Sequence, residues 1–138
     1  MNRRKFLNTS MLAAAAVGAP TIVPSSVFGQ NAPSNRIHVG FIGTGRQGTT
    51  ANLPQMMAVP GVQVVAVCDV DSWRMGEAAK IVDRFYAKAS GLSSYSRCAQ
   101  QSDFRHILAD RNIDALMIST PDHWHVPIGL MAAAAGKH

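Results

Sequence analysis

Four short runs of apolar and β-branched residues, alternating with stretches of helical periodicity, are the strongest constraint on how this chain can fold. Three of them span residues 36–43, 62–70 and 114–119, and a shorter one lies within the polar stretch 90–101. Strands that alternate with helices over short connections pair in parallel, because each helix returns the chain to the same end of the sheet. We therefore predict an α/β fold, a Rossmann-like doubly wound parallel sheet with the strand order 3-2-1-4.

Helices are predicted from the spacing of apolar residues. They cover residues 49–59, 72–89, 102–111 and 125–136. Pro54 should kink or shorten the first helix, because proline lacks an N–H and its ring collides with the preceding turn. Ser102 is the predicted N-cap of the third helix, and Gly136 should end the fourth. The apolar face of the second helix is predicted to contain Met75, Ala78, Ala79, Val82, Phe85 and Tyr86.

The segment between the first strand and the first helix matches the pattern G-x-G-x-x-G through Gly43, Gly45 and Gly48. Gly43 would allow a tight turn, Gly45 would let the backbone approach a pyrophosphate, and Gly48 would let the helix pack closely on the strand. A helix N-terminus also offers free N–H groups to phosphates. The alternative is a tight turn that binds nothing. The position of the loop between a buried strand and a helix favours a dinucleotide site.

Asp69 ends the second strand, 26 residues after Gly43. A carboxylate at this place can accept hydrogen bonds from the hydroxyls of an adenosine ribose. The alternative role is that of an acid at a helix N-terminus, which Asp71 could fill equally well. Because a carboxylate repels a 2′-phosphate, NAD is the predicted cofactor. NADP is the alternative, since Arg46 and Arg74 could offset that repulsion.

The segment TPDHWH, residues 120–125, follows the fourth strand. His123 and His125 are two residues apart with only Asp122 nearby, so no metal site is predicted. A second interpretation is that the histidines only cap the following helix. In the order 3-2-1-4 the first and fourth strands are neighbours, and this segment then faces the glycine loop across the crevice where ligands bind. We therefore favour a wall of the nicotinamide half of a cofactor pocket.

The formal charge of +5 does not indicate a nucleic-acid-binding surface, because much of it lies at the N-terminus. Arg3, Arg4 and Lys5 account for three of the 13 basic residues. The remaining 10 basic residues and the 8 acidic residues give a net charge of 10 − 8 = +2. Cys68 lies inside a strand pattern and Cys98 in a polar segment. We expect two free thiols rather than a disulfide.

Residues 1–29 have the pattern of a twin-arginine signal peptide. NRRKFL is followed by the Ala- and Gly-rich apolar stretch MLAAAAVGAPTIV, and cleavage is expected after Gly29. The alternatives are an amphipathic N-terminal helix or a retained membrane anchor. Residues 30–35 are interpreted as a linker, and residues 36–138 as a nucleotide-binding domain. The expected location is the periplasm, or another compartment reached by the twin-arginine export machinery.

Five segments together resemble the N-terminal domain of the Gfo/Idh/MocA oxidoreductases. They are GFIGTGRQG, VAVCDVD, DFRHIL, IDALMISTPDHWH and AAAAGKH, in that order, within residues 36–138. The resemblance implies NAD or NADP as cofactor and hydride transfer at a carbon of a sugar or polyol. It also implies that Gly43, Thr44, Gly45, Arg46 and Gln47 hold the pyrophosphate, that Asp69 binds the adenosine ribose, and that Thr120, Pro121, His125 and the nearby His123 line the nicotinamide ribose.

In that family the lysine that assists proton transfer belongs to a Glu-Lys-Pro segment after AGKH, and a substrate-binding domain follows it. The chain ends at His138, so we assign no catalytic residue and interpret the sequence as an N-terminal fragment, truncated after the fourth strand and its helix. The fourth strand should then present an unpaired outer edge. Three functions stay open, namely a sugar oxidoreductase, an NAD-dependent glycosidase of the same family and a non-catalytic nucleotide-binding remnant. The sequence leaves homo-oligomer formation open.

Replacing both Arg3 and Arg4 with lysine tests the twin-arginine interpretation. The double variant should stay in the cytoplasm at full precursor length, because the export machinery reads the arginine pair itself. Cell fractionation followed by immunoblotting measures both location and length. Normal export and trimming of the variant would contradict the interpretation.

Overall fold

The computed structural model describes residues 35–91 and 95–138, so the predicted signal peptide and nearly all of the predicted linker lie outside the described residues. The elements in chain order are β1 (Ile37–Ile42), the π-helical turn η3 (Gly48–Asn52), α2 (Leu53–Met57), β2 (Val62–Cys68), α3 (Ser72–Ser90), β3 (Ala99–Gln101), α4 (Phe104–Ala109), β4 (Ala115–Ile118) and α5 (Asp122–Ala134). Within these two described stretches, no helix is both long enough and apolar enough to cross a membrane.

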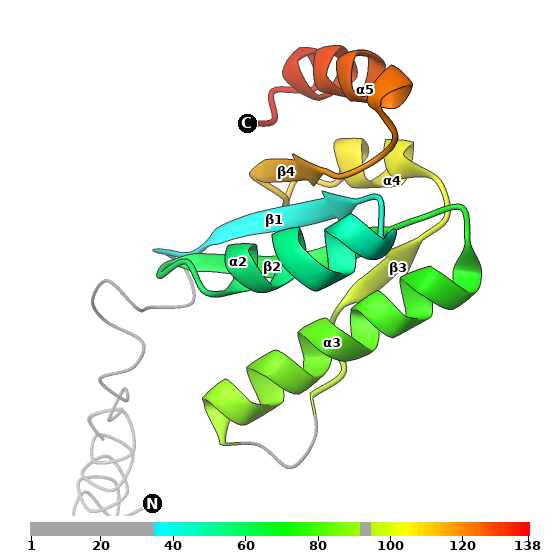
Figure 1. The fold of residues 1–138 in the computed structure, drawn as a ribbon. Coiled ribbons are helices and arrows are strands. Elements are labelled where there is room, and N and C mark those ends of the chain that lie inside the picture. The colour runs from blue at the N-terminus through cyan, green and yellow to red at the C-terminus, as the bar shows by residue number, and fades with distance from the viewer. Residues whose placement is uncertain (1–34, 92–94) are drawn as a thin grey trace, which may run out of the picture. The chain divides into compact units, whose positions relative to one another are not determined.

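The four strands form one parallel sheet in the order β3-β2-β1-β4 (Figure 1). Ile42, the last residue of β1, is aligned with Cys68 of β2 on one side and with Ile118 of β4 on the other. The three strands therefore end at the same level, and the loops that follow them meet at one edge of the sheet. This arrangement confirms the predicted fold and strand order.

Helices cover both faces of the sheet, and each face has its own apolar core. The first core lies under α2 and α3, and its buried residues are Phe41, Leu53, Met57, Val64, Val67, Ala78, Ala79, Val82 and Tyr86. The second lies under α4 and α5, and its buried residues are Ile42, Ala66, Cys68, Ile107, Ile113 and Ile128. Figure 1 shows the two helix pairs on opposite sides of the strands. Successive side chains of a strand point to opposite faces, so β1 supplies Phe41 to one core and Ile42 to the other.

The predicted helix over residues 49–59 consists of two segments, and Pro54 lies just after their junction. The N–H of Leu53 donates to the carbonyl oxygen of Gly48, five residues back, which closes the wide turn η3. Pro54 is the second residue of α2, where its missing N–H leaves no hydrogen bond unmade. The distortion predicted at this proline is therefore present as a π-helical turn.

Two local predictions were wrong. Asp103 caps α4 instead of Ser102, because its carboxylate accepts a hydrogen bond from the N–H of Arg105 at 2.9 Å. Phe85 is 39% exposed although it lies on the predicted apolar face of α3. Its ring packs edge-on against Tyr86, whose hydroxyl oxygen accepts a hydrogen bond from the N–H of Val64 at 2.9 Å.

The last residues of the chain turn back along β4. Gly136 ends the chain's final helical stretch with φ of +73°, a left-handed conformation that favours glycine and that confirms the predicted stop. Lys137 Nζ donates to the carbonyl oxygens of Asp110 and Ile113. The backbone of His138 donates to the Asp114 carbonyl at 3.1 Å and accepts from the Leu116 N–H at 2.8 Å. We expected the outer edge of β4 to be unpaired. The Asp114 carbonyl and the Leu116 N–H at this edge are instead paired with His138.

Both cysteines are free thiols, as the sequence predicted. Burial, together with smaller effects of the carboxylates of Asp69 and Asp103, raises the pKa of the Cys68 thiol to about 11. Burial also raises the pKa of Cys98 to about 12, with Asp83 adding to the effect. A thiol is nucleophilic only as its thiolate, so both side chains should be inert near neutral pH.

Thiol labelling with a chromogenic disulfide reagent at pH 8 should therefore be slow for the folded protein and fast in 6 M urea. Because the folded-state pKa values exceed the ordinary value of about 8.5, the protonated thiols stabilise the fold fully below that pH. This contribution is lost as the pH rises toward 11. Cys68→Ser and Cys98→Ser variants assign the two labelling rates. Rapid labelling of Cys68 in the folded protein would contradict its burial.

Candidate functional site

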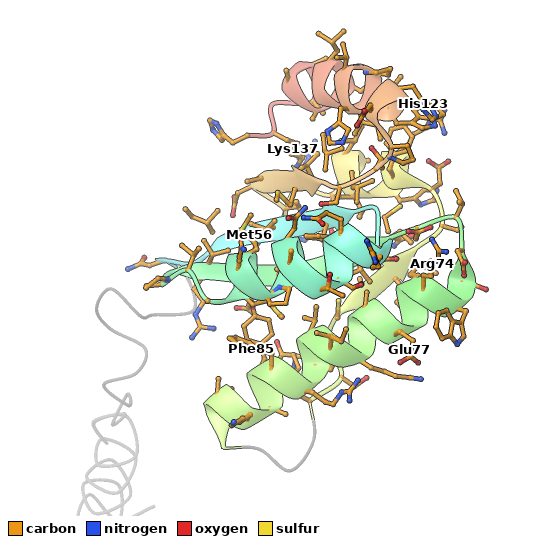
Figure 2. All side chains as sticks on the ribbon, viewed as in Figure 1. Met56, Arg74, Glu77, Phe85, His123 and Lys137 are labelled. Carbon is orange, nitrogen blue, oxygen red and sulfur yellow. The ribbon has the colours of Figure 1, made fainter. Side chains whose placement is uncertain are left out.

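The carboxyl ends of β1, β2 and β4 surround a cleft of about 550 Å³, within the range of small-molecule sites. The glycine loop contributes Gly43, Gly45, Arg46, Gln47 and Gly48 to its lining. The other lining residues are Ile42, Cys68, Asp69, Val70, Asp71, Arg74, Ser102, Phe104, Ser119, Thr120, Pro121, His123, Trp124 and Ile128. Figure 2 shows Arg74 and His123 at the side of the sheet toward which β1 runs.

Gly43 and Gly48 are required by close packing of the loop. Gly43 has φ of +94°, and a Cβ at this residue would lie 2.6 Å from the carbonyl carbon of Ser119. A Cβ at Gly48 would lie 2.4 Å from the carbonyl oxygen of Gly43 and 3.2 Å from the Phe41 ring. These contacts match the tight turn and the close helix–strand approach predicted from the sequence.

Gly45 differs from the other two because it faces open space. The nearest atom to a Cβ built on Gly45 is Nη1 of Arg74, 3.9 Å away. No packing contact requires glycine here, yet the residue lines the cleft. Its missing side chain leaves room for a ligand to approach the backbone, which is the role predicted for it.

Asp69 holds the glycine loop against the end of β2. Its Oδ2 accepts hydrogen bonds from the N–H of Thr44 at 2.7 Å and from the Thr44 hydroxyl at 2.9 Å. Its Oδ1 accepts a hydrogen bond from the N–H of Asp71 at 2.9 Å. The carboxylate thus lies in the cleft lining with a fixed orientation.

The role of helix N-cap, which the sequence left open for Asp69, belongs to Asp71. Its carboxylate accepts hydrogen bonds from the N–H groups of Trp73 and Arg74 at the start of α3. It also forms an exposed ion pair with Arg74 at 3.3 Å. Asp69 is therefore not needed to cap α3, and its free acceptor capacity faces the cleft.

The opposite wall is the turn between β4 and α5. Nε2 of His125 contacts the carbonyl oxygen of Thr120 at 2.7 Å. A carbonyl oxygen only accepts, so this ring nitrogen donates and the imidazole fixes the turn. Thr120 Oγ1 is the only buried side-chain oxygen or nitrogen in the described part of the chain that lacks a hydrogen-bond partner. An orphaned hydroxyl in a cleft wall indicates a polar ligand group.

Eight of the ten predicted site residues line the cleft. They are Gly43, Gly45, Arg46, Gln47, Asp69, Thr120, Pro121 and His123. Thr44 does not line it, because it is 2% exposed and its hydroxyl is directed to Asp69. His125 is exposed outside the lining, where it contacts Thr120. The sequence prediction did not include Ser119, Phe104 and Trp124, which also line the cleft, although Trp124 lies between the two predicted histidines.

The residues present fit a dinucleotide better than a metal ion. The open space at Gly45, the exposed cationic side chains of Arg46 and Arg74 and the orphaned Thr120 hydroxyl are suited to an anionic, hydroxyl-rich ligand. In the described ranges 35–91 and 95–138, no group of three or more His, Cys, Asp or Glu residues could hold a metal ion.

Residues 37–138 match the family model described as the Gfo/Idh/MocA oxidoreductase family, NAD-binding Rossmann fold. A curated relative from Saccharopolyspora erythraea, a glycosyl hydrolase family 109 protein, is 33% identical over 153 residues. That alignment covers 99% of this chain and 32% of the relative. The chain spans about a third of the length of the curated relatives that it matches.

Solved structures of sugar and polyol dehydrogenases are similar to the described fold. The myo-inositol dehydrogenase of Lactobacillus casei, in complex with NAD(H) and myo-inositol, is 26% identical with a TM-score of 0.57. The match covers 74% of this chain and 26% of that one. A levoglucosan dehydrogenase in complex with NADH and levoglucosan is 29% identical with a TM-score of 0.52, covering 75% of this chain and 26% of that one.

Gly43→Ala and Gly45→Ala should separate folding from ligand binding. The first places a methyl group against Ser119 at a positive φ, so urea unfolding should show a loss of about 3 kcal/mol. The second should leave the unfolding midpoint nearly unchanged but weaken NAD binding about tenfold in calorimetry, since about 1.4 kcal/mol of lost contact is tenfold. Gly129→Ala, a helical glycine with open space around it, is the control. Equal destabilisation by both loop variants would contradict this division.

Proposed function

This chain belongs to the Gfo/Idh/MocA oxidoreductase family and contains its NAD-binding Rossmann fold, and from that premise we propose that the complete gene product removes a hydride from a carbon of a sugar or polyol. The single observation that carries the proposal is the cleft at the carboxyl ends of the strands, with glycine at its open face. A crevice at this switch point of a doubly wound sheet is where such folds bind dinucleotides.

The cleft divides into a part for phosphate and a part for the nicotinamide end. Gly45, Arg46 and Gln47 would face the pyrophosphate, because they line the cleft directly before η3, and the first N–H groups of a helical segment are suited to bind phosphate. Thr120 and His123 line the opposite wall, and the Thr120 hydroxyl would donate to or accept from a ribose hydroxyl. Bound NAD supplies the hydride acceptor.

NAD is the proposed cofactor in preference to NADP. The Asp69 carboxylate lies in the cleft lining and accepts three hydrogen bonds in a fixed orientation. A fixed negative charge near the adenosine ribose accepts a hydrogen bond from a 2′-hydroxyl and repels a 2′-phosphate. Arg46 and Arg74 reduce this repulsion without removing it, because both are exposed to solvent screening.

The sugar or polyol substrate is proposed from the similar dehydrogenases. The myo-inositol and levoglucosan enzymes are named for substrates whose secondary alcohol carbons can lose a hydride. A second candidate is a glycosidase that uses tightly bound NAD, because the curated relatives are named as glycosyl hydrolase family 109 proteins. Both candidates use the same cleft, so only the reaction product separates them.

We also propose that the protein is exported by the twin-arginine route to the periplasm. The arginine pair, the weakly apolar stretch after it and the small residues before Gln30 support this proposal. The Arg3 and Arg4 variant described above tests it.

Two assays on the complete gene product distinguish the candidate reactions. With NAD and a panel of polyols, we expect NADH to accumulate in proportion to alcohol oxidised, measured by its absorbance. With a chromogenic glycoside and no added cofactor, we expect no release of the chromophore. Chromophore release without net NADH would instead establish the glycosidase. Absence of both reactions would contradict the proposed function. The matched inactive control is Gly45→Val, whose side chain fills the space that faces the phosphates.

A further inference from the structure

Thr44 occupies the second position of the glycine motif, yet its side chain does not line the cleft and is directed to Asp69. The residue is 2% exposed and is not part of the cleft lining. Its hydroxyl donates to Asp69 Oδ2 at 2.9 Å and its N–H donates to the same oxygen at 2.7 Å. Both the hydroxyl and the N–H of Thr44 are thus bonded to Asp69, whereas the resemblance to the family implies that Thr44 holds the pyrophosphate.

The two donors of Thr44 determine which part of Asp69 is available to a ligand. A carboxylate oxygen has about two lone-pair sites. Both sites on Oδ2 are used by Thr44, and one site on Oδ1 is used by the N–H of Asp71. One acceptor site on Oδ1 is left for the cleft, in an orientation that the three donors fix.

We propose that Thr44 is a positioning residue, which holds the Asp69 carboxylate so that its Oδ1 accepts from the ribose 2′-hydroxyl of NAD, while the charge of Asp69 itself disfavours the 2′-phosphate of NADP. The inference rests on the proposed function, because it concerns the same nucleotide site. Donors that fix a charged acceptor before the ligand arrives remove the ordering cost from binding. Without the Thr44 hydroxyl, the carboxylate keeps its charge but rotates more freely.

The discrimination follows from what each cofactor offers to the remaining acceptor site. A 2′-hydroxyl has a proton to donate to Oδ1, whereas a 2′-phosphate at pH 8 has none and adds negative charge. Losing the fixed orientation therefore weakens NAD binding selectively. NADP never gained from that orientation, so its affinity should hardly change.

Calorimetric titration of the complete gene product with NAD and with NADP tests the inference. Thr44→Val should weaken NAD binding roughly tenfold, which is the scale of one hydrogen bond to a charged group, and should change NADP binding less than twofold. Thr44→Ser keeps the hydroxyl and should keep the wild-type affinity ratio. Thr50→Val removes a hydroxyl bonded only to the Arg46 carbonyl at 2.7 Å and should also leave the ratio unchanged.

The Asp69→Asn background shows whether Thr44 acts through Asp69. Asp69→Asn alone should lower the NAD-to-NADP ratio at least as much as Thr44→Val, and adding Thr44→Val should lower it no further. Equal weakening of both cofactors by Thr44→Val, an unchanged ratio, or a Thr44→Ser variant that behaves like the valine variant would overturn the inference. A wild-type protein that binds neither dinucleotide would overturn the proposed function itself.

Discussion

The close contact between the ends of β1 and β4 is the constraint on which the rest of the site depends. The N–H of Ser119 donates to the Ile42 carbonyl at 2.7 Å, and Gly43 then passes so near the Ser119 backbone that any Cβ would collide with it. The two turns that follow these strands therefore diverge from one point. One turn supplies backbone donors suited to phosphate and the other supplies the Thr120 hydroxyl, so a single contact sets the spacing of both walls.

The position of the site could be predicted from the sequence, but the direction of its side chains could not. Alternating strand and helix patterns predict a parallel, doubly wound sheet, and the strand order of that sheet determines which loops meet. Thr44 lies in the loop after β1 and His125 in the first turn of α5, close to where they were predicted, yet both are directed to partners within the protein. Which donor reaches Asp69 depends on atomic distances that no residue spacing encodes. The N-cap of α4 is likewise decided by atomic distance, because the Asp103 carboxylate and not the predicted Ser102 accepts from the N–H of Arg105.

The nucleotide half and the substrate half of the proposed reaction place different demands on the chain. Backbone groups and a few fixed side chains suffice to recognise a dinucleotide, and the described residues supply them. Recognition of one particular sugar needs side chains that surround the reacting carbon. The chain covers about a third of the length of the curated relatives, and the family model that matches residues 37–138 is that of the NAD-binding fold.

The return of the chain along β4 has a consequence for how the domain folds. Lys137 contacts the carbonyls of Asp110 and Ile113, more than twenty residues earlier in the chain. The backbone of His138 forms hydrogen bonds along the outer edge of β4. Such contacts form only after α5 has docked on the sheet, because they close a loop that includes the whole helix. β4 is only four residues long, so its alignment and the docking of α5 are expected to be one cooperative event. The cleft wall formed by Thr120, Pro121 and His123 would then be among the last parts of the domain to become ordered.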